Sequence, residues 1–550
     1  MSGPKLVRAS STNVTAGVES ARPCGLPMET PLTPLEFMRR ARRLYGDREA
    51  VVDGALRWTY AQFFERCDRW SGALQALGVV PGDRVAYISP NSHAQLASFY
   101  AVPQIGAVLV PINFRLSAEE FQYLIAHSGA TVVCVDAEYL DAVDGLRAQL
   151  PGVRHFVALS GTRAGWLDYD LLVADAAGEP LRPAVDERDL LTINYTSGTT
   201  SRPKGVMITH RNAWVNAMGL LAHYPMSPAD CYLWTLPMFH ANGWTFTWVV
   251  TAMGGRHVCL RKVEPAAVFR LVADEGITFM CAAPTVLIAL ANAPEALKAH
   301  VPAGVRLLTA GAPPAAATIQ RIEEGLGWTV LHLYGLTETS PFMTASEVRP
   351  EHLVLAPAER ARQKARQGVE QVTGGEVRVI DDTGAEVPAD GTTQGEIVVR
   401  GNVVMAGYYD DPAATAAAMG DGWFHSGDAA VVHADGYLEI RDRLKDVIIS
   451  GGENISSVEV EATLLRHAAV QEVAVVGFPD EQWGEAPHAF VVFRAGAQAP
   501  PAELRAFCRE HLAHFKTPHS FTAVDDLPKT ATGKIQKFVL RQGKPNIAAQ

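Results

Sequence analysis

One stretch of ten residues has the composition of a site for a polyanion. Thr196-Ser197-Gly198-Thr199-Thr200-Ser201-Arg202-Pro203-Lys204-Gly205 opens with six small residues, five of which carry hydroxyls. The backbone N–H groups and hydroxyls of such a loop can converge on phosphate oxygens, and Lys204 adds a movable cation. The segment does not fit the G-x-x-x-x-G-K-[ST] pattern of a P-loop. We therefore expect nucleotide phosphates held in another way, and a flexible hydroxyl-rich linker is the alternative.

A second candidate segment, Tyr334 to Thr339, directly follows a predicted strand at 329–333. Ligands of open α/β sheets bind at the carboxyl ends of strands. There Gly335 would let a ligand approach the backbone, Tyr334 offers a flat face for a purine, and Glu338 offers a hard oxygen for Mg²⁺. The alternative is an ordinary strand-to-helix turn with Thr337 as N-cap.

Two further segments place charged groups beside glycines. In Gly422-Trp423-Phe424-His425-Ser426-Gly427-Asp428 the carboxylate of Asp428 can accept two hydrogen bonds from the vicinal hydroxyls of a ribose, unless it only forms an Asx-turn. Lys534 follows a glycine in Lys529-Thr530-Ala531-Thr532-Gly533-Lys534-Ile535, on an exposed turn near the end of the ordered chain. Most surface lysines have no specific role, so Lys534 alone does not indicate a catalytic site.

The elements that must position these residues alternate between strands and helices, which is typical of α/β layering. Strands are predicted at 84–89, 108–110, 130–135, 276–282, 305–309 and 329–333, and helices at 92–100 and 118–127, the latter opened by the capping box Ser117 to Glu120. From about residue 441 the pattern changes to two strands at 472–477 and 488–494 and a helix from 502 to about 515. We therefore predict a small C-terminal α+β domain.

We place the domain boundary in the charged run Arg441 to Asp446. Together with Gly451-Gly452-Glu453-Asn454, this run is typical of a hinge followed by a glycine-rich turn. The alternative is a charge run that is only solvated. The predicted organisation is a disordered tail at 1–30, an N-terminal domain at 31–441 and a C-terminal domain at 442–550. The tail is rich in Ser, Thr, Ala and Pro and lacks an apolar signal segment; a transit peptide is the alternative.

Composition narrows the class of protein. With 550 residues, at least two domains are expected, and 59 acidic against 48 basic residues argue against a nucleic-acid partner. Seven scattered cysteines predict neither disulfides nor a zinc site, and Cys134 reads as a buried strand residue. No apolar run reaches transmembrane length, and the last residues are not a peroxisomal address. A cytoplasmic protein is expected, with monomer and homodimer both open.

The order and combination of five segments resemble the acyl-adenylate-forming superfamily of acyl-CoA synthetases, luciferases and peptide-synthetase adenylation domains. The matching segments are YTSGTTSRPKGV at 195–206, YGLTET at 334–339, GWFHSGD at 422–428, RDRLKDVIISGGENIS at 441–456 and KTATGKI at 529–535. The resemblance covers roughly residues 35–540. Ser201 stands where the family usually has glycine. The resemblance implies a large N-terminal α/β adenylating domain of several subdomains and a small, mobile C-terminal α+β domain.

The resemblance also implies roles for individual residues. ATP, Mg²⁺ and CoA would be used: the carboxylate of an acid attacks the α-phosphorus of ATP, and the acyl-AMP then reacts with the thiol. The phosphates would contact Thr196, Ser197, Gly198, Thr199, Thr200 and Lys204; the adenosine would contact Gly311, Ala312, Pro313, Tyr334, Gly335, Thr337, Asp428 and Arg443. Glu338 and Thr196 would hold Mg²⁺, and Lys534 would bridge the carboxylate and the α-phosphate. Lys445 would be the hinge, and Gly451 and Gly452 would reach the pantetheine tunnel.

Substrate class follows from the segment Leu236 to Trp244. His240 stands where amino-acid-activating relatives carry Asp, and it is not a dependable anion at neutral pH, so an amino-acid substrate is disfavoured. The segment resembles the branch that acts on medium-chain, short branched or aromatic acids. His240 would lie beside the carboxyl group, and Gly243, Trp244, Ala310 and Ser340 would shape the acyl pocket; for Trp244 and Trp248 the alternative is core packing.

We therefore expect an acyl-CoA ligase, with a medium-chain fatty acid as the first choice of substrate. An aromatic acid–CoA ligase and an acyl-AMP ligase that loads a carrier protein are the alternatives. A luciferase-like oxygenase has no separate support, and a non-catalytic nucleotide sensor is disfavoured because Lys534, Glu338 and Asp428 are all present.

Overall fold

A computed structural model describes residues 28–196, 203–451, 453–530 and 534–543. Residues 1–27 of the predicted tail, the loop residues Ser197 to Thr200, and Gly452 lie outside the described residues. The chain divides into two units, residues 1–31 and residues 32–550. In the first unit, residues 28–31 are exposed and belong to no helix or strand. All further description concerns the second unit.

A mostly parallel sheet carries the candidate segment at 334–339. It has nine strands in the order β16-β15-β14-β13-β12-β10-β11-β1-β2. Their bounds are β16 (Val369–Glu370), β15 (Phe342–Ala345), β14 (Thr329–Gly335), β13 (Arg306–Thr309), β12 (Phe279–Ala282), β10 (Cys231–Trp234), β11 (Arg256–Cys259), β1 (Glu49–Asp53) and β2 (Leu56–Thr59). The parallel pairings from β1 to β14 bring the carboxyl ends of these strands to one edge.

A second sheet of eight strands carries the hydroxyl-rich loop. Its order is β19-β9-β8-β4-β3-β5-β6-β7, with β19 (Gly407–Tyr408), β9 (Lys204–Thr209), β8 (Leu190–Thr196), β4 (Val108–Ile112), β3 (Arg84–Ile88), β5 (Ala130–Val135), β6 (His155–Ala158) and β7 (Leu167–Asp168). The chain runs from β3 to β4 on one side and then to β5 on the other, so the strand order reverses at β3. The loop joins the antiparallel strands β8 and β9, in which Thr196 pairs with Lys204.

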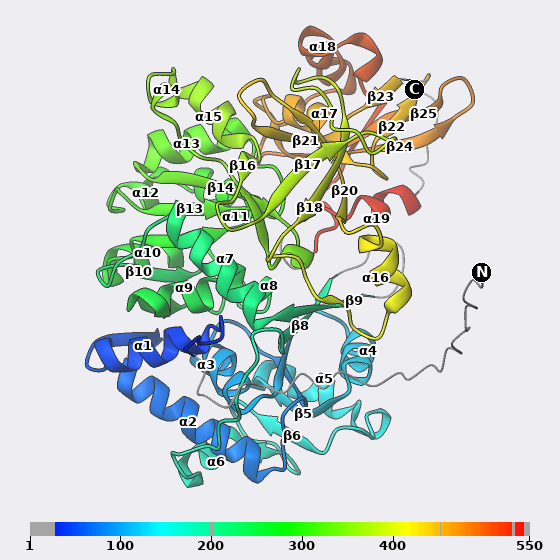
Figure 1. Cartoon of the computed structure of the whole chain (residues 1–550). Helices are drawn as coiled ribbons and strands as arrows, with labels where there is room; N and C mark the ends of the chain where they lie inside the picture. The colour runs from blue at the N-terminus through cyan, green and yellow to red at the C-terminus, as the bar shows by residue number, and fades with distance from the viewer. Residues whose placement is uncertain (1–27, 197–202, 452, 531–533, 544–550) are drawn as a thin grey trace, which may run out of the picture. The chain divides into compact units, whose positions relative to one another are not determined.

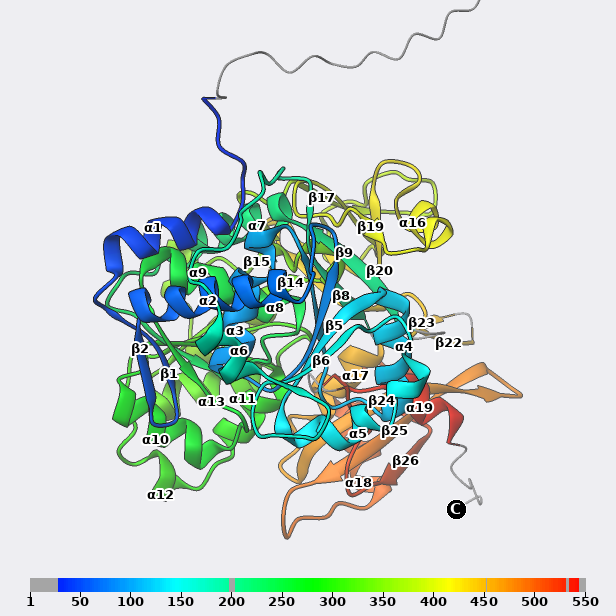
Figure 2. The same cartoon turned by 90° about the horizontal axis from the view of Figure 1, so that it is seen from below.

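Helices form three layers around the two sheets. One hydrophobic cluster joins both sheets through α1 (Leu35–Tyr45), α2 (Tyr60–Ala76), α3 (His93–Ala101), α6 (Tyr169–Asp175), α7 (His210–His223) and α9 (Phe246–Met253). The outer face of the nine-stranded sheet packs on α10 (Pro265–Glu275), α11 (Pro284–Ala291), α13 (Ala316–Leu326) and α15 (Pro357–Ala365). The outer face of the eight-stranded sheet packs on α4 (Ala118–Ser128) and α5 (Leu140–Asp144). Figure 2 looks along these layers, with α10 at the left, α4 at the right, and α3 and α6 between them.

Short helices and a small sheet complete this part of the chain. The helices are α8 (Ala241–Trp244), α12 (Glu295–Lys298), α14 (Pro350–Leu353), α16 (Pro412–Met419), η1 (Pro103–Ile105), η2 (Ala137–Tyr139), η3 (Arg147–Gln149) and η4 (Thr337–Thr339). The sheet is antiparallel, in the order β17-β18-β20-β21, with β17 (Glu376–Ile380), β18 (Gly395–Arg400), β20 (Phe424–Val432) and β21 (Leu438–Arg443).

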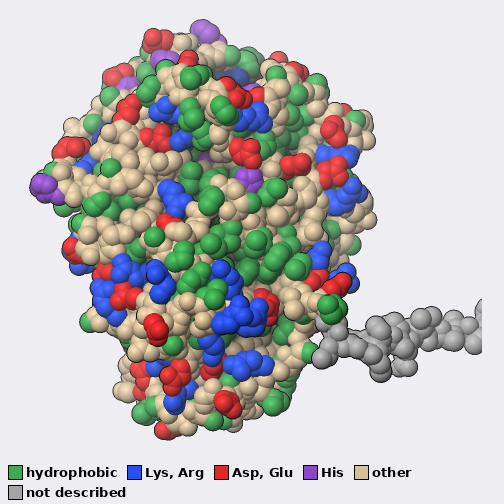
Figure 3. Space-filling view, turned by 60° about the vertical axis from the view of Figure 1, so that its left-hand side comes forward, with side chains coloured by type: hydrophobic (Ala, Val, Ile, Leu, Met, Phe, Trp, Pro, Cys, Tyr) green, Lys and Arg blue, Asp and Glu red, His purple; other side chains and the backbone are tan. Residues whose placement is uncertain are grey.

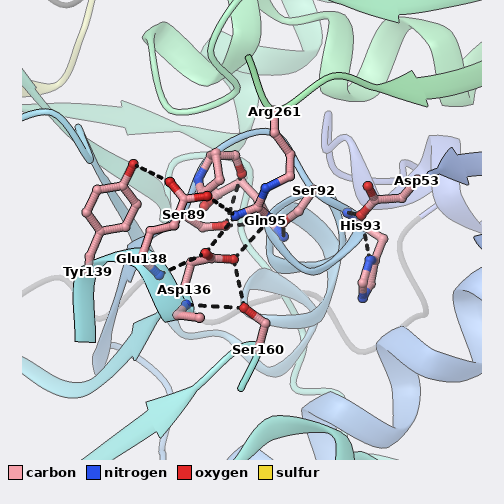
Figure 4. Close-up of polar contacts among 12 residues, drawn as sticks. Asp53, Ser89, Ser92, His93, Gln95, Asp136, Glu138, Tyr139, Ser160 and Arg261 are labelled. Carbon is pink, nitrogen blue, oxygen red and sulfur yellow. Dashed lines mark hydrogen bonds and ion pairs between the residues drawn. The ribbon is translucent and has the colours of Figure 1, made fainter. Parts of the chain in front are cut away.

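A polar cluster joins the carboxyl ends of the two large sheets. Arg261, just after β11, donates to both carboxylate oxygens of Asp136, just after β5, at 2.7 and 3.2 Å, and to Glu138 at 2.9 Å. Figure 4 shows Arg261 reaching across to Asp136, which also accepts from Ser160 at the end of the next strand. The Asp136 side chain is only 3% exposed, and removing one partner of a buried charged pair is costly. The cluster fixes the two sheets relative to each other.

The C-terminal part has its own sheet and two hydrophobic clusters. Its strands are β23 (Glu453–Ile455), β22 (Ile448–Ser450), β25 (Gly484–Phe493), β24 (Val470–Asp480) and β26 (Ser520–Ala523). Its helices are α17 (Ser457–Leu464), α18 (Pro501–His511), η5 (His514–Lys516) and α19 (Lys537–Gln542). In Figure 1 α17, α18 and β22 to β25 lie at the top, and β5 and β6 lie at the bottom. The predicted class, a large N-terminal α/β part and a smaller C-terminal α+β part, is confirmed.

Most predicted elements are present, with shifted ends. The capping box at Ser117 and Glu120 is formed, and β3, β5 and β13 differ from their predicted ranges by at most one residue. The helix predicted from 502 to about 515 is wrong at its end: α18 stops at His511 and a separate 3-10 turn follows. The prediction for Cys134 is confirmed, since its side chain is fully buried in β5.

Two surface findings bear on the earlier expectations. On the face in Figure 3, basic and acidic side chains are intermixed instead of forming a basic stripe. Within residues 28–543, gaps excepted, no helix is long and apolar enough to cross a membrane.

Candidate active site

Tyr334, Asp428 and Arg443 meet where the nine-stranded sheet and the four-stranded sheet come together. Tyr334 is the last residue but one of β14, and its hydroxyl donates to Asp428 Oδ2 at 2.7 Å. Asp428 lies within β20 instead of an Asx-turn and is 5% exposed. It pairs in register with Arg443 of β21, whose Nε lies 3.5 Å from Asp428 Oδ1. The buried carboxylate is therefore oriented by a phenol and faces a guanidinium, and its remaining lone pairs can accept further hydrogen bonds.

Glu338, Tyr408 and Lys204 form a second group. Glu338 lies in η4, and its Oε1 accepts a hydrogen bond of 3.0 Å from the hydroxyl of Tyr408. Lys204 Nζ lies 4.6 Å from the centre of the Tyr408 ring, a cation–π contact. Burial raises the pKa of Glu338, whereas the Tyr408 hydroxyl and the charges of Arg443 and Lys204 oppose that rise.

Tyr408 is a residue of this site that the sequence did not predict. It lies in the two-residue strand β19, which pairs antiparallel with β9 so that Tyr408 faces Val206 across the sheet. That pairing brings residues about two hundred positions apart into contact, and no local sequence pattern predicts such a pairing. The only signal is Gly407, whose φ of 143° marks an irregular backbone just before the tyrosine.

Lys534 lies within electrostatic range of Asp428 and Arg443, both in the first of these groups. Its turn is closed by two hydrogen bonds with Thr530, one from the Thr530 N–H at 2.7 Å and one to the Thr530 hydroxyl at 3.1 Å. Burial and the charge of Arg443 lower the pKa of Lys534 to about 8, against the opposing effect of Asp428 and Asp446. The ammonium group is thus held among site residues of both parts of the chain.

His240 lies within electrostatic range of Lys534, in the segment between β10 and α8. It precedes α8, and burial together with the charge of Lys534 lowers the pKa of His240 to about 4. At neutral pH the imidazole is therefore uncharged and carries one N–H donor and one acceptor nitrogen. A neutral donor suits an anionic carboxyl group without competing with Lys534 for charge.

Trp244 lies next to His240, with 6.5 Å between the centres of the two rings. Its ring is 3% exposed and packs edge-to-face on Phe342 at 5.6 Å between ring centres. A Cβ added to Gly311 would lie 3.7 Å from Trp244 Cζ2, so the indole also lies against the glycine that follows β13. Ala310 is buried beside it, and Ser340 is buried with its hydroxyl unpaired among the described residues.

Two glycines of the predicted site are required by packing. A Cβ on Gly243 would lie 2.5 Å from the ring of Trp234, so this glycine accommodates the core, and Trp248 is likewise a core residue. A Cβ on Gly335 would lie 1.9 Å from the carbonyl oxygen of Pro341, which comes from the neighbouring segment before β15.

The remaining predicted residues lie around the same edge or at the hinge. Thr337 opens η4, whose N-cap is Leu336, so the alternative reading of Thr337 as an N-cap is wrong. Gly311 has a φ of 88° and leads into Ala312 and Pro313. Lys445 is exposed in the turn between β21 and β22. The N–H of Gly451 donates to the carbonyl of Trp483 at 2.7 Å.

Family models match both parts of the chain. The AMP-binding enzyme model matches residues 37–409, and the model of the AMP-binding enzyme C-terminal domain matches residues 459–534. Both matches fall on the elements described above.

Proteins of similar sequence include several CoA ligases. The 4-hydroxybutyrate–CoA ligase 2 of Metallosphaera sedula is 44% identical over 519 residues, which cover 93% of this chain and 94% of the relative. The 2-methylpropanoate–CoA ligase CCL4 of Humulus lupulus is 42% identical, with 93% of this chain and 95% of the relative covered. The acetate–CoA ligase CCL3 of the same plant is 41% identical, with 94% and 96% covered.

Solved structures of similar fold include a CoA ligase and a protein that binds ATP. The anthranilate CoA ligase AuaEII, in complex with anthranoyl-AMP, has a TM-score of 0.85 at 25% identity, covering 94% of this chain and 98% of that chain. ATP-bound MatB from Rhodopseudomonas palustris has a TM-score of 0.82 at 28% identity, covering 94% and 100%.

Proposed function

The chain belongs to the AMP-binding enzyme family and is an AMP-forming acid–thiol ligase, and from that premise we propose that it joins a short carboxylic acid to CoA through an acyl-adenylate. In the first half-reaction a carboxylate oxygen attacks the α-phosphorus of ATP and pyrophosphate leaves. In the second the thiolate of CoA attacks the acyl carbonyl and AMP leaves. Both half-reactions place negative charge where the substrates meet, so the protein must supply positive charge and orientation.

The observation that carries the proposal is the position of Lys534, in electrostatic range of His240 on one side and of Asp428 on the other. We assign the ribose hydroxyls to Asp428, held by Tyr334 and Arg443. Lys534 then lies between the sugar end and the carboxyl end of the reacting pair, where its ammonium bridges the α-phosphate and the acid. The neutral imidazole of His240 donates a hydrogen bond to the carboxyl group.

The second group, which consists of Glu338, Tyr408 and Lys204, is assigned to the phosphates and the metal. Lys204 is assigned to the β- and γ-phosphates, with Thr196 and the loop that follows it. The oxygens of Glu338 and Thr196 would hold Mg²⁺, since that ion binds through one or two protein oxygens and the phosphates of its substrate. The donor chemistry fits for two reasons. Among the described residues, Tyr408 bonds only Oε1 of Glu338. Strand β9, in which Lys204 pairs with Thr196, contacts η4. Bound Mg²⁺ would neutralise charge on the phosphates.

We propose a short acid as substrate. In this proposal Trp244, which packs on Phe342 and lies against Gly311, would block the path of a long acyl chain. The ligases for acetate, 2-methylpropanoate and 4-hydroxybutyrate among the relatives agree with a small pocket. The sequence reading placed medium-chain fatty acids first, and that preference stays an untested prediction. An aromatic acid is the second candidate, because AuaEII acts on anthranilate.

The C-terminal domain would rotate about Lys445 between the half-reactions, and Gly451 and Gly452 would then approach the pantetheine arm. The boundary that the sequence predicts at 441/442 is moved to Lys445 in this proposal, because β21 of the large part extends to Arg443. Carrier-protein loading, the oligomeric state and a cytoplasmic location stay predictions.

The proposal is tested with purified protein, ATP, Mg²⁺ and CoA and a panel of straight-chain acids from C2 to C16, 2-methylpropanoate, 4-hydroxybutyrate and benzoate, with AMP and thioester measured together. We expect the highest kcat/KM for acids of two to five carbons. AMP release that needs a carrier protein instead of CoA, or pyrophosphate exchange with no acid of the panel, would contradict the proposal.

A further inference from the structure

The junction between the large N-terminal part and the C-terminal part is held by polar contacts. Among the described residues, every hydrophobic cluster lies wholly before or wholly after Lys445: three end by Ile440 and two begin at Ile448 or later. No apolar core spans the junction in the part of the chain that the structure describes. The orientation of the C-terminal part therefore depends on a small number of hydrogen bonds and ion pairs.

Asp442 makes the best-placed of these contacts. Its backbone is fixed in β21, where it pairs with Ala429 of β20, so it belongs to the large part. Its Oδ2 accepts a hydrogen bond of 2.7 Å from the backbone N–H of Ser457, the first residue of α17, and another from the Ser457 hydroxyl. Asp442 is 2% exposed and Ser457 is fully buried. A buried carboxylate at a helix N-terminus also gains from the helix dipole.

The contact extends into the C-terminal part through Lys537. Lys537, at the start of α19, donates to the Ser457 hydroxyl and lies 2.8 Å from Glu461 Oε1 in α17. Burial opposes the charge of Lys537, but the carboxylates of Glu461 and Asp442 raise its pKa. The ammonium is therefore shared between an acid of its own domain and an acid of the large part.

We propose that Asp442 is a positioning residue that holds the C-terminal domain in the orientation in which Lys534 reaches the nucleotide. This inference rests on the proposed function, in which Lys534 serves adenylation and the domain then rotates about Lys445. Since Asp442 precedes the rotation point and Ser457 follows it, rotation must separate the two. The contact thus favours the first half-reaction and has to open for the second.

The two half-reactions should respond in opposite directions to the loss of this contact. A hydrogen bond to a charged group contributes more than a neutral one, so Asp442→Asn should lower the rate of ATP–pyrophosphate exchange roughly 10-fold or more. The rate at which supplied acyl-AMP and CoA form the thioester should stay the same or rise. Glu459→Gln is the matched control: it also converts a carboxylate of the α17 region to an amide, but its partner Lys516 lies in the same domain, at 2.7 Å. Both rates of this variant should stay within about 2-fold of wild type.

A second variant and a distance measurement guard against simple misfolding. Ser457→Ala removes one of the two donors to Asp442, so it should change the ratio of the two rates in the same direction by a smaller factor. Spin labels on cysteines introduced at the exposed Ala296 and Ala462 report the orientation without any catalysis. The distance distribution should be narrow in wild type and shift or broaden in Asp442→Asn.

Equal loss of both half-reactions in Asp442→Asn and Ser457→Ala, or an unchanged distance distribution, would overturn the inference. Wild-type protein that exchanges pyrophosphate with no acid would instead overturn the proposed function, and the spin-label distances would still decide whether Asp442 holds the domain.

Discussion

Replacing Trp244 with alanine should move the preferred acid toward longer chains. The indole is 3% exposed and lies against Phe342 and Gly311, so its removal opens an apolar space behind His240. Burying each added CH₂ of an acid contributes about 0.8 kcal/mol. Four added CH₂ groups therefore give about 3 kcal/mol, or a gain on the order of 100-fold in kcat/KM for a C6 to C8 acid relative to acetate.

The assay is kcat/KM for straight-chain acids from C2 to C10 with saturating ATP and CoA. Truncating a buried tryptophan costs about 3–5 kcal/mol of stability, so thermal unfolding is measured alongside. Trp248→Ala is the matched control, because Trp248 is 1% exposed and packs in the core on Phe99. It should lower stability without moving the preferred chain length. An unchanged preference in a folded Trp244→Ala enzyme, or an equal shift in Trp248→Ala, would refute the reasoning.

The remaining predictions concern the metal end, acid stability and the pH profile. Tyr408→Phe removes the hydroxyl that supports ionised Glu338, so KM for MgATP should rise roughly 10-fold; an unchanged KM would remove Tyr408 from the site. Burial lowers the pKa of His257 to about 3 and of His332 to about 4. Between pH 6.5 and 4 the unfolded chain therefore binds protons that the folded chain does not, and stability must fall as the pH falls. Each histidine should cost about 2 kcal/mol at pH 5, read as the free energy of unfolding in urea from pH 7.5 to 5, and a flat profile would contradict it. Because burial lowers the pKa of Lys534 to about 8, its charge is present below that pH, and kcat/KM for ATP should decline above pH 8 in wild type but not in Lys534→Arg.

The sequence predicted the fold class well because the signals are local. Alternating apolar runs, capping boxes and the order of five segments were enough for the α/β layers and the smaller C-terminal domain. The end of α18 was wrong because the apolar pattern continues past His511 into Phe515, where a 3-10 turn carries it instead of a helix.

The site was harder to predict where it depends on long-range pairing. The sequence pointed to Asp428 and Arg443 separately, but only the register of β20 with β21 pairs them. The sequence did not predict Tyr408 as a site residue, because its contact with Glu338 depends on a two-residue strand at the edge of the eight-stranded sheet. The roles predicted for Gly243 and Gly335 stay predictions, and long-range packing adds a second reason for glycine there, because a Cβ would meet Trp234 and Pro341.

The assignment of Lys534 is tested most directly by measuring the two half-reactions of Lys534→Ala separately. Losing a charge that stabilises the transition state should lower acid-dependent ATP–pyrophosphate exchange by roughly 100-fold or more. Conversion of supplied acyl-AMP and CoA to the thioester should stay within a few-fold of wild type. Exchange that persists at the wild-type rate, or equal loss of both half-reactions, would contradict the role assigned to this lysine.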